Sequence, residues 1–211
     1  MLIVFDLDGT LIDSSKDLAI AMNATREHLG MPPIDPNLIY SFVGNGVRVL
    51  VQRALGENAS KDLVDQGYQF FLTFYGAHAV DNTSLYPGIE EILERLSAQH
   101  KLAILTNKPV EISYKIVKNL QLEKYFLRVY GGDSFSEKKP APVGIHVLMQ
   151  ELKAPSSEVL MVGDSSVDVE TARNANVKSC GVSWGFQPES LKKSGPDLLI
   201  NDPADILEHV D

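Results

Sequence analysis

Short runs of hydrophobic residues recur along this chain, and the segments between most of them have apolar residues at helical spacing. The runs have the pattern of strands that are buried on both faces of a parallel sheet. We expect strands at 2–5, 101–105, 128–131, 158–162, 179–182 and 198–200. Because strand and helix alternate, the sequence predicts an α/β fold, with a Rossmann-like parallel sheet and helices on both faces.

The interval between the first two predicted strands is different, because it has helical patterns and no strand pattern. Helices are expected at 14–30, 46–55 and 61–78, with breaks at Pro32, Pro33 and Pro36. We therefore predict an all-helical subdomain at residues 14–83, inserted into an α/β core formed by residues 1–13 and 84–211.

Two carboxylates follow the first strand directly. Asp6 and Asp8 are two residues apart, so their side chains would point the same way and repel each other. A hard cation such as Mg²⁺ offsets this repulsion, because it prefers oxygen ligands. Gly9 would let the backbone approach a ligand, and Thr10 adds a hydroxyl. Taken alone, the same residues fit a polar turn equally well.

Other polar residues stand at corresponding places later in the chain. Thr106 and Asn107 follow the strand at 101–105, Asp164 and Asp168 follow the strand at 158–162, and Lys139 precedes a helix. Each has a structural alternative as a helix cap or a surface charge. In a parallel sheet, however, all these strand ends open on one edge. Together they favour a pocket for Mg²⁺ and a phosphate group.

Composition narrows the function classes. The 211 residues include 19 Lys and Arg against 28 Asp and Glu, a net charge of −9, and no basic stripe, so nucleic acid is not an expected partner. No apolar run approaches the roughly 20 residues of a membrane span, and the N-terminus lacks the basic region of a signal peptide. The single cysteine, Cys180, fits a reducing compartment. We expect a cytoplasmic protein, either a monomer or a homodimer.

These motifs resemble those of the haloacid dehalogenase superfamily, in the order in which that family carries them. The match covers the whole predicted core: Asp6-Leu-Asp8-Gly-Thr10, Leu105-Thr-Asn107, Lys139-Pro140 and Val162-Gly-Asp164 with Asp168. The helical insert lies where subclass I members have their cap. Asp8 favours phosphoryl transfer, because dehalogenase members lack an aspartate at this position.

The resemblance implies a role for each motif residue. Asp6 would be the nucleophile that forms an aspartyl-phosphate, and Asp8 the general acid and base. Mg²⁺ would be bound by Asp6, the Asp8 carbonyl and Asp164. Lys139 would neutralise charge on the nucleophile and the phosphate. The remaining expected roles are phosphate binding by Gly9, Thr106 and Asn107, and orientation of Lys139 or a metal-bound water by Asp168.

Within the superfamily, residues 42–51, 106–109 and 131–134 resemble the phosphoglycolate phosphatases. A small phosphorylated metabolite such as 2-phosphoglycolate is therefore the expected substrate. Asn45 and Arg48, around the start of the helix at 46–55, are candidates to bind its carboxylate. The alternative is a glycine turn with a solvated arginine. The aromatic cluster at 70–75 is expected to be packing.

Three other classes of function are alternatives to this expectation. A mutase resembling β-phosphoglucomutase, or a phosphatase for another small phosphoester, would use the same scaffold. A receiver-type signalling module also combines acidic residues with Thr and Lys, but it is shorter, has no helical insert and carries its acceptor on a middle strand. A binding protein without catalysis is disfavoured because no expected catalytic position is missing.

Overall fold

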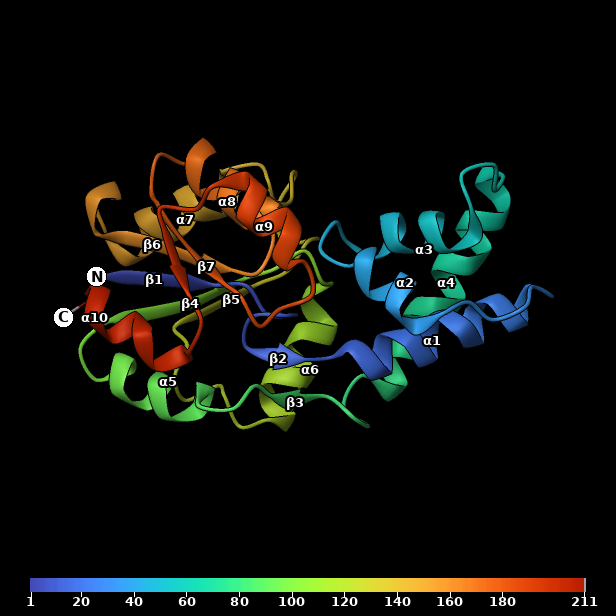
Figure 1. Cartoon of the computed structure of the whole chain (residues 1–211), viewed down its shortest axis with the longest axis horizontal. Helices are drawn as coiled ribbons and strands as arrows, with labels where there is room; N and C mark the ends of the chain where they lie inside the picture. The colour runs from blue at the N-terminus through green and yellow to red at the C-terminus, as the bar shows by residue number, and fades with distance from the viewer. Residues whose placement is uncertain (211) are drawn as a thin grey trace.

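The computed structural model describes residues 1–210. An α/β core and a helical unit lie side by side along the long axis, with both ends of the chain in the core (Figure 1). The core sheet has six parallel strands in the order β5-β4-β1-β6-β7-β8. Its strands are β1 (Leu2–Phe5), β4 (Lys101–Leu105), β5 (Arg128–Tyr130), β6 (Val159–Gly163), β7 (Lys178–Val182) and β8 (Leu198–Ile200). All six predicted strands are confirmed within one residue.

The central strand β1 explains why the sheet is buried on both faces. Successive side chains of a strand point to opposite faces. Leu2 and Val4 therefore pack in one hydrophobic cluster, and Ile3 and Phe5 in the other. The first cluster includes residues of α7 (Val143–Leu152) and α8 (Ser166–Asn174), and the second includes residues of α5 (Ile89–Ser97), α6 (Val110–Asn119) and η2 (Pro203–Ile206). A short α10 (Leu207–Val210) ends the described chain, and η1 (Ser156–Glu158) precedes β6.

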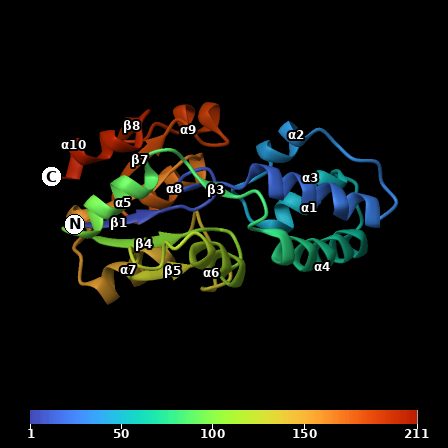
Figure 2. The ribbon, with the colours of Figure 1, turned by 90° about the horizontal axis from the view of Figure 1, so that it is seen from below.

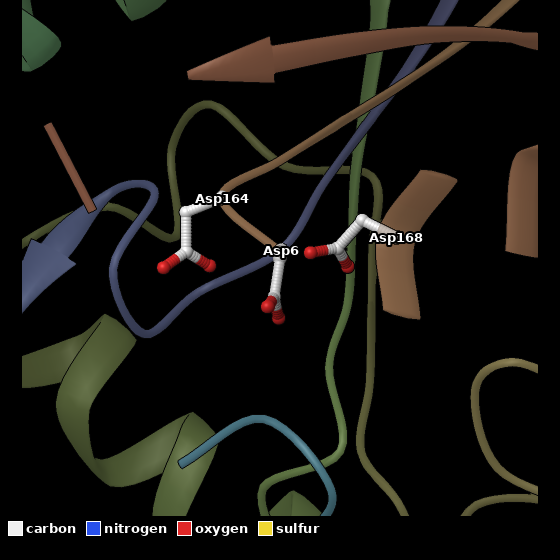
Figure 3. A group of neighbouring side chains, drawn as sticks. All are labelled: Asp6, Asp164 and Asp168. Atoms are coloured by element: carbon white, nitrogen blue, oxygen red, sulfur yellow. The ribbon is translucent and has the colours of Figure 1, made fainter. Parts of the chain in front are cut away.

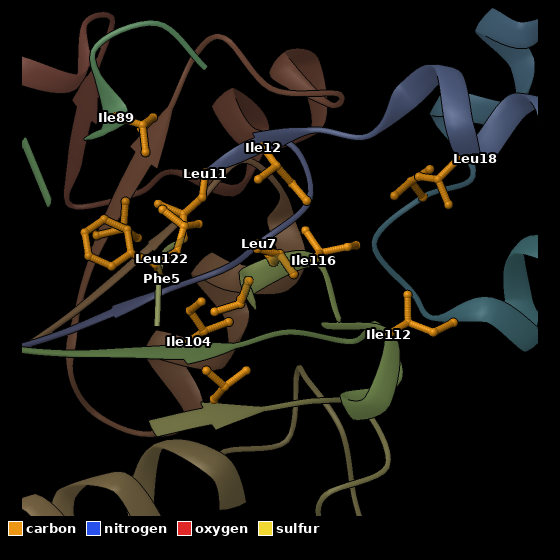
Figure 4. Close-up of a cluster of buried hydrophobic side chains, with 14 of the residues drawn as sticks. Phe5, Leu7, Leu11, Ile12, Leu18, Ile89, Ile104, Ile112, Ile116 and Leu122 are labelled. Atoms are coloured by element: carbon orange, nitrogen blue, oxygen red, sulfur yellow. The ribbon is translucent and has the colours of Figure 1, made fainter. Parts of the chain in front are cut away.

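Residues 15–78 form the helical unit: α1 (Ser15–His28), α2 (Pro36–Ser41), α3 (Val47–Leu55) and α4 (Lys61–His78). Helix α1 packs against α2 and α4, and α3 packs against α4. Seen from the perpendicular direction, the unit lies beyond the ends of the sheet strands and does not cover either face (Figure 2). The hydrophobic core continues into it, because Leu7, Leu11 and Ile12 extend the cluster under the sheet toward Leu18 of α1 (Figure 4).

Two short helices differ from the sequence analysis. Pro36, expected to break the chain, is instead the first residue of α2, where its missing N–H costs nothing. The side chain of Asp35 accepts a hydrogen bond from the Asn37 N–H and caps this helix. Helix α9 (Pro188–Ser194), which was not predicted, also begins at a proline.

The helical unit is joined to the core by two chain segments, which pair as the two-residue antiparallel strands β2 (Ile12–Asp13) and β3 (Ser84–Leu85). Neither was predicted. Asp17, in the first turn of α1, ties the same segments together. Its buried carboxylate accepts hydrogen bonds from the backbone N–H and side chain of both Asn82 and Thr83, at 2.7–3.1 Å. The two connecting segments therefore form a single joint between the core and the helical unit, held by strand pairing and by the hydrogen bonds of Asp17.

Replacing this carboxylate is expected to destabilise the protein. Burial alone would raise the pKa of Asp17, but the hydrogen bonds from Asn82 and Thr83 outweigh it and lower the pKa. Stability from a lowered pKa is present at neutral pH and disappears as the pH falls through the folded-state value. Asp17→Ala should cost about 3 kcal/mol in urea unfolding at pH 7, and the difference from the unmodified protein should shrink below pH about 4. A difference independent of pH would contradict this account.

In the part of the chain that the structure describes, no helix is both long enough and apolar enough to cross a bilayer.

Candidate active site

A pocket lies where the carboxyl ends of β1, β4 and β6 face the helical unit. In the strand order, the chain passes from β1 to β4 and β5 on one side of β1, and then crosses to β6, β7 and β8 on the other side. Ligands of open α/β sheets bind at such a switch in strand order. The core contributes polar residues to the lining, including Asp6, Asp8, Thr106, Asn107, Lys108 and Asp164. The helical unit contributes mainly apolar ones, including Leu18, Val43, Val47, Leu50 and Tyr75.

Three buried carboxylates gather at the sheet edge, from Asp6 after β1, Asp164 after β6 and Asp168 in α8 (Figure 3). One oxygen from each lies within 4.8 Å of the others. Lys139 is the cation among them. Its Nζ lies 3.0 Å from Asp6 Oδ1 and 2.6 Å from Asp168 Oδ1. The structure therefore brings these four predicted site residues close together.

Glycines make this close packing possible. Gly9 has a φ of +78°, and a Cβ there would lie 2.3 Å from Asp164 Oδ2. A Cβ on Gly185 would lie 2.2 Å from the Asp164 Cβ, and one on Gly163 would lie 2.2 Å from the Asp168 Cγ. No side chain fits at such distances, so only glycine at these three positions lets the backbone pack directly against the side chains of Asp164 and Asp168.

The charges of the cluster are not balanced by protein groups alone. Burial raises the pKa of Asp6 to about 6, with Asp168 and Asp8 adding to the rise and Lys139 opposing it. Burial and the neighbouring carboxylates of Asp168 and Asp6 likewise raise the pKa of Asp164 well above its usual range. A divalent cation would offset this cost, and carboxylate oxygens are the ligands that Mg²⁺ prefers. The donor set therefore fits a hard metal ion.

The hydrogen bonds separate the three carboxylates by role. Asp168 Oδ1 accepts from Lys139, and Oδ2 accepts from the N–H and hydroxyl of Ser165 at 3.1 and 2.7 Å. Both oxygens of Asp168 are thus engaged by donors. Asp164 Oδ2 accepts from the Phe186 N–H at 2.7 Å, and Asp6 Oδ1 from the Leu7 N–H at 2.7 Å. Each of these two has its other oxygen available for a ligand.

Asp8 lies on the pocket side and is held by a lysine that the sequence analysis did not consider. Lys108 Nζ donates to Asp8 Oδ1 and Oδ2 at 2.7 and 2.8 Å, and to the Tyr75 hydroxyl oxygen at 2.7 Å. The Ser14 hydroxyl also donates to Asp8 Oδ1, at 2.5 Å. Burial alone would lower the pKa of Lys108, but Asp8 and Tyr75 outweigh it and raise the pKa. Burial raises the pKa of Tyr75 to about 12.

Thr106 and Asn107 are buried and line the pocket as expected. Asn107 also links the two halves of the molecule, because its Nδ2 donates at 2.9 Å to the backbone oxygens of both Gly44 and Lys139. The neighbouring carbonyls are held similarly: Val43 accepts from the Gln187 side chain, and Asn45 accepts from Lys138 at 2.7 Å. Three core side chains thus donate hydrogen bonds to three consecutive backbone carbonyls of the helical unit, those of residues 43, 44 and 45.

Three predicted site residues have other contacts in the structure. Gly9 is packed against Asp164 and is not among the residues that line the pocket. Asn45 contributes its backbone oxygen to Lys138. Arg48, with a side chain 53% exposed, pairs with Asp65 at 2.5 Å and lies over the ring of Tyr68. The structure does not bring Arg48 to the pocket, because the first turn of α3 directs it toward α4.

Lys108, Tyr75 and Gln187 are among the pocket residues that sequence reasoning missed. Lys108 directly follows Thr106 and Asn107 at the end of β4. Its position beside two predicted site residues is the sequence signal that could have identified it as a site residue. Tyr75 is indeed packed in the core, with its ring stacked on Phe71. Its hydroxyl nevertheless reaches the pocket, a detail that helical spacing alone does not reveal.

Similarity to known proteins identifies the family of this chain. Residues 3–182 match a family model described as haloacid dehalogenase-like hydrolase. A phosphoglycolate phosphatase of Vibrio parahaemolyticus is 40% identical over 99% of this chain and 95% of its own length. One of Chromobacterium violaceum is also 40% identical, over 98% of this chain and 94% of its own length.

A solved structure agrees as well. The crystal structure of a predicted phosphoglycolate phosphatase from Haemophilus somnus superposes with a TM-score of 0.93 at 33% identity, covering 100% of this chain and 97% of that one. The family model, the relatives and the solved structure thus agree on the family to which this chain belongs. The chain belongs to the haloacid dehalogenase-like hydrolases, and among them it is a phosphatase that resembles the phosphoglycolate phosphatases.

Proposed function

We propose that this phosphatase is Mg²⁺-dependent and hydrolyses 2-phosphoglycolate to glycolate and phosphate through a phosphorylated Asp6. The observation that carries the proposal is that Asp6, Asp8 and Asp164 line one pocket at the carboxyl edge of the sheet, with the Lys139 ammonium 3.0 Å from Asp6 Oδ1. The names of the relatives support the substrate.

In the first step, a carboxylate oxygen of Asp6 attacks phosphorus. A bond forms between Asp6 and phosphorus, and the bond from phosphorus to the ester oxygen breaks. Asp8, on the pocket side of Asp6, donates a proton to the departing alkoxide. Lys139, 3.0 Å from Asp6, offsets negative charge as the phosphate approaches the nucleophile.

In the second step, Asp8 takes a proton from water, which attacks the phosphorus of the aspartyl-phosphate. The bond to Asp6 breaks, phosphate leaves, and both carboxyl groups return to their starting states. Thr106 and the backbone of Asn107 line the pocket where they would hold a phosphoryl oxygen in both steps. Asp168 keeps Lys139 in position, since its Oδ1 accepts from Nζ at 2.6 Å.

Asp6, Asp164 and the backbone carbonyl of Asp8 would hold the metal, whereas the donors on Asp168 leave it to orient Lys139. Bound there, Mg²⁺ supplies positive charge that stabilises the transition state of phosphoryl transfer.

The helical unit is proposed to act as a cap, comprising residues 14–83. Its apolar side chains form one wall of the pocket and would exclude water while Asp6 is phosphorylated. Cap opening would hinge at residues 13–15 and 82–86, next to the joint held by Asp17. The carboxylate of the substrate would meet the N-terminus of α3, because Gly46 and Val47 line the pocket there.

A panel of phosphate esters tests the proposal. With Mg²⁺, we expect kcat/KM for 2-phosphoglycolate to exceed that for p-nitrophenyl phosphate and for sugar phosphates by at least about 10-fold, since a carboxylate contact is worth roughly 1.5–3 kcal/mol. Excess chelator should abolish turnover of every ester, and added Mg²⁺ should restore it. Conversion between glucose phosphates without phosphate release would instead identify a mutase. Activity unaffected by chelator would contradict the metal requirement.

A further inference from the structure

The Lys108 ammonium is buried between Asp8 of the core and Tyr75 of α4. Its side chain is 3% exposed. Its Nζ has three close oxygen neighbours, both carboxylate oxygens of Asp8 and the hydroxyl oxygen of Tyr75, and it lies 4.7 Å from the centre of the Tyr75 ring. These contacts occupy the donors of the ammonium, which has three. Lys108 therefore has no donor left for a substrate group.

Asp8 needs such support because little else fixes its carboxylate. Of its contacts, Ser14 reaches only Oδ1, whereas Lys108 reaches both oxygens and so fixes the plane of the group. Proton transfer requires the carboxyl oxygen to lie within hydrogen-bond reach of the reacting atom, and a displacement of about 1 Å can cost about 100-fold in rate.

Tyr75 holds the lysine in turn. The tyrosine is fully buried in α4, and its ring packs on Phe71, so the hydroxyl has a fixed position. A lysine side chain is flexible, and its entropy opposes a single orientation. The Tyr75 hydroxyl oxygen, 2.7 Å from the Lys108 Nζ, and the adjacent Tyr75 ring restrict the lysine to one orientation.

We propose that Lys108 is a positioning residue for Asp8, with Tyr75 as its anchor, so that the helical unit sets the orientation of the acid and base of the core. This inference rests on the proposed function of Asp8. Lys108 acts through Asp8 and makes no contact of its own with substrate.

Lys108→Met should lower kcat for 2-phosphoglycolate by about 10²-fold and change KM by less than about twofold, because only the placement of Asp8 is lost. Residues that act as a unit are strongly non-additive. Lys108→Met added to Asp8→Asn should therefore have almost no further effect on kcat. Tyr75→Phe, which removes only the hydroxyl, should give a smaller loss in kcat that disappears in the Lys108→Met background.

Lys115→Met is the matched control. Lys115 also binds α4 from the core, through the backbone oxygens of Gly76 and Ala77 at 2.6 and 2.9 Å, but it does not touch Asp8. If Lys108 acts by placing Asp8 and not merely by docking α4 on the core, Lys115→Met should keep kcat within about twofold of the unmodified protein.

The outcomes separate cleanly. A large rise in KM for Lys108→Met, or a loss additive with Asp8→Asn, would mean that Lys108 binds substrate and would overturn the inference. A normal kcat in Lys108→Met alongside an impaired Asp8→Asn protein would overturn only the inference. A fully active Asp8→Asn protein would remove the proposed function itself. If Lys108→Met does not fold, the Tyr75→Phe cycle with Asp8→Asn decides in the same way.

Discussion

Asp6→Asn should abolish turnover of every phosphate ester, with kcat falling by at least about 10⁴-fold, the scale seen when an essential nucleophile is removed. The amide has nearly the same shape as the carboxylate, but its oxygen is a poor nucleophile. It also removes one negative charge from the proposed metal site. The measurement is steady-state phosphate release with Mg²⁺ for 2-phosphoglycolate and p-nitrophenyl phosphate.

The fold should tolerate this change. The pKa of Asp6 is raised to about 6, chiefly by burial, so its ionised form is disfavoured in the folded protein and a neutral side chain costs little. Asp202→Asn is a suitable control, because Asp202 is exposed, lies outside the pocket and caps a turn that asparagine also caps. It should keep full activity. An active Asp6→Asn protein, free of unmodified enzyme, would end the proposed mechanism.

Asp8→Asn should separate the two chemical steps. With p-nitrophenyl phosphate the leaving group needs little help from an acid, so Asp6 can still be phosphorylated. Hydrolysis of the aspartyl-phosphate then lacks its general base, which typically contributes about 10²–10⁴-fold. We expect a rapid burst of about one p-nitrophenolate per active site, followed by slow steady-state turnover. Stopped-flow absorbance measures both phases.

The same variant should behave differently with 2-phosphoglycolate, whose alkoxide leaving group needs a proton. Both steps are then impaired, so the burst should be slow or missing. Equal bursts with the two esters would argue against Asp8 as the general acid. Loss of activity without any burst from p-nitrophenyl phosphate would argue against Asp8 as the base of the second step.

The sequence predicts the sheet and the polar edge well because both depend on local pattern. Buried strands of a parallel sheet leave continuous apolar runs, and the carboxyl ends of such strands share an edge wherever the helices lie. Asp6, Asp164 and Thr106 could therefore be brought together without coordinates. The helical nature of residues 15–78 was also readable, because no strand pattern interrupts it.

What the sequence could not reveal depends on contacts between distant segments. The strands β2 and β3 are two residues long, and they exist because Ile12 pairs with Leu85 and Asp13 with Ser84. Arg48 finds Asp65 on a neighbouring helix, 17 positions away, and so turns from the pocket. Lys108 and Tyr75 are 33 positions apart. The residues next to Lys108 and Tyr75 in the sequence do not indicate that Lys108 contacts both Tyr75 and Asp8.

The phosphorylated residue is the central claim, and its direct measurement is mass spectrometry of the trapped enzyme. Asp8→Asn protein would be mixed with p-nitrophenyl phosphate and Mg²⁺, quenched in acid during the slow phase and digested with pepsin at low pH. We predict one added phosphoryl group on the peptide that contains Asp6, absent when Asp6 is also replaced by Asn. A phosphoryl group on Asp164, or on a peptide without Asp6, would contradict the account.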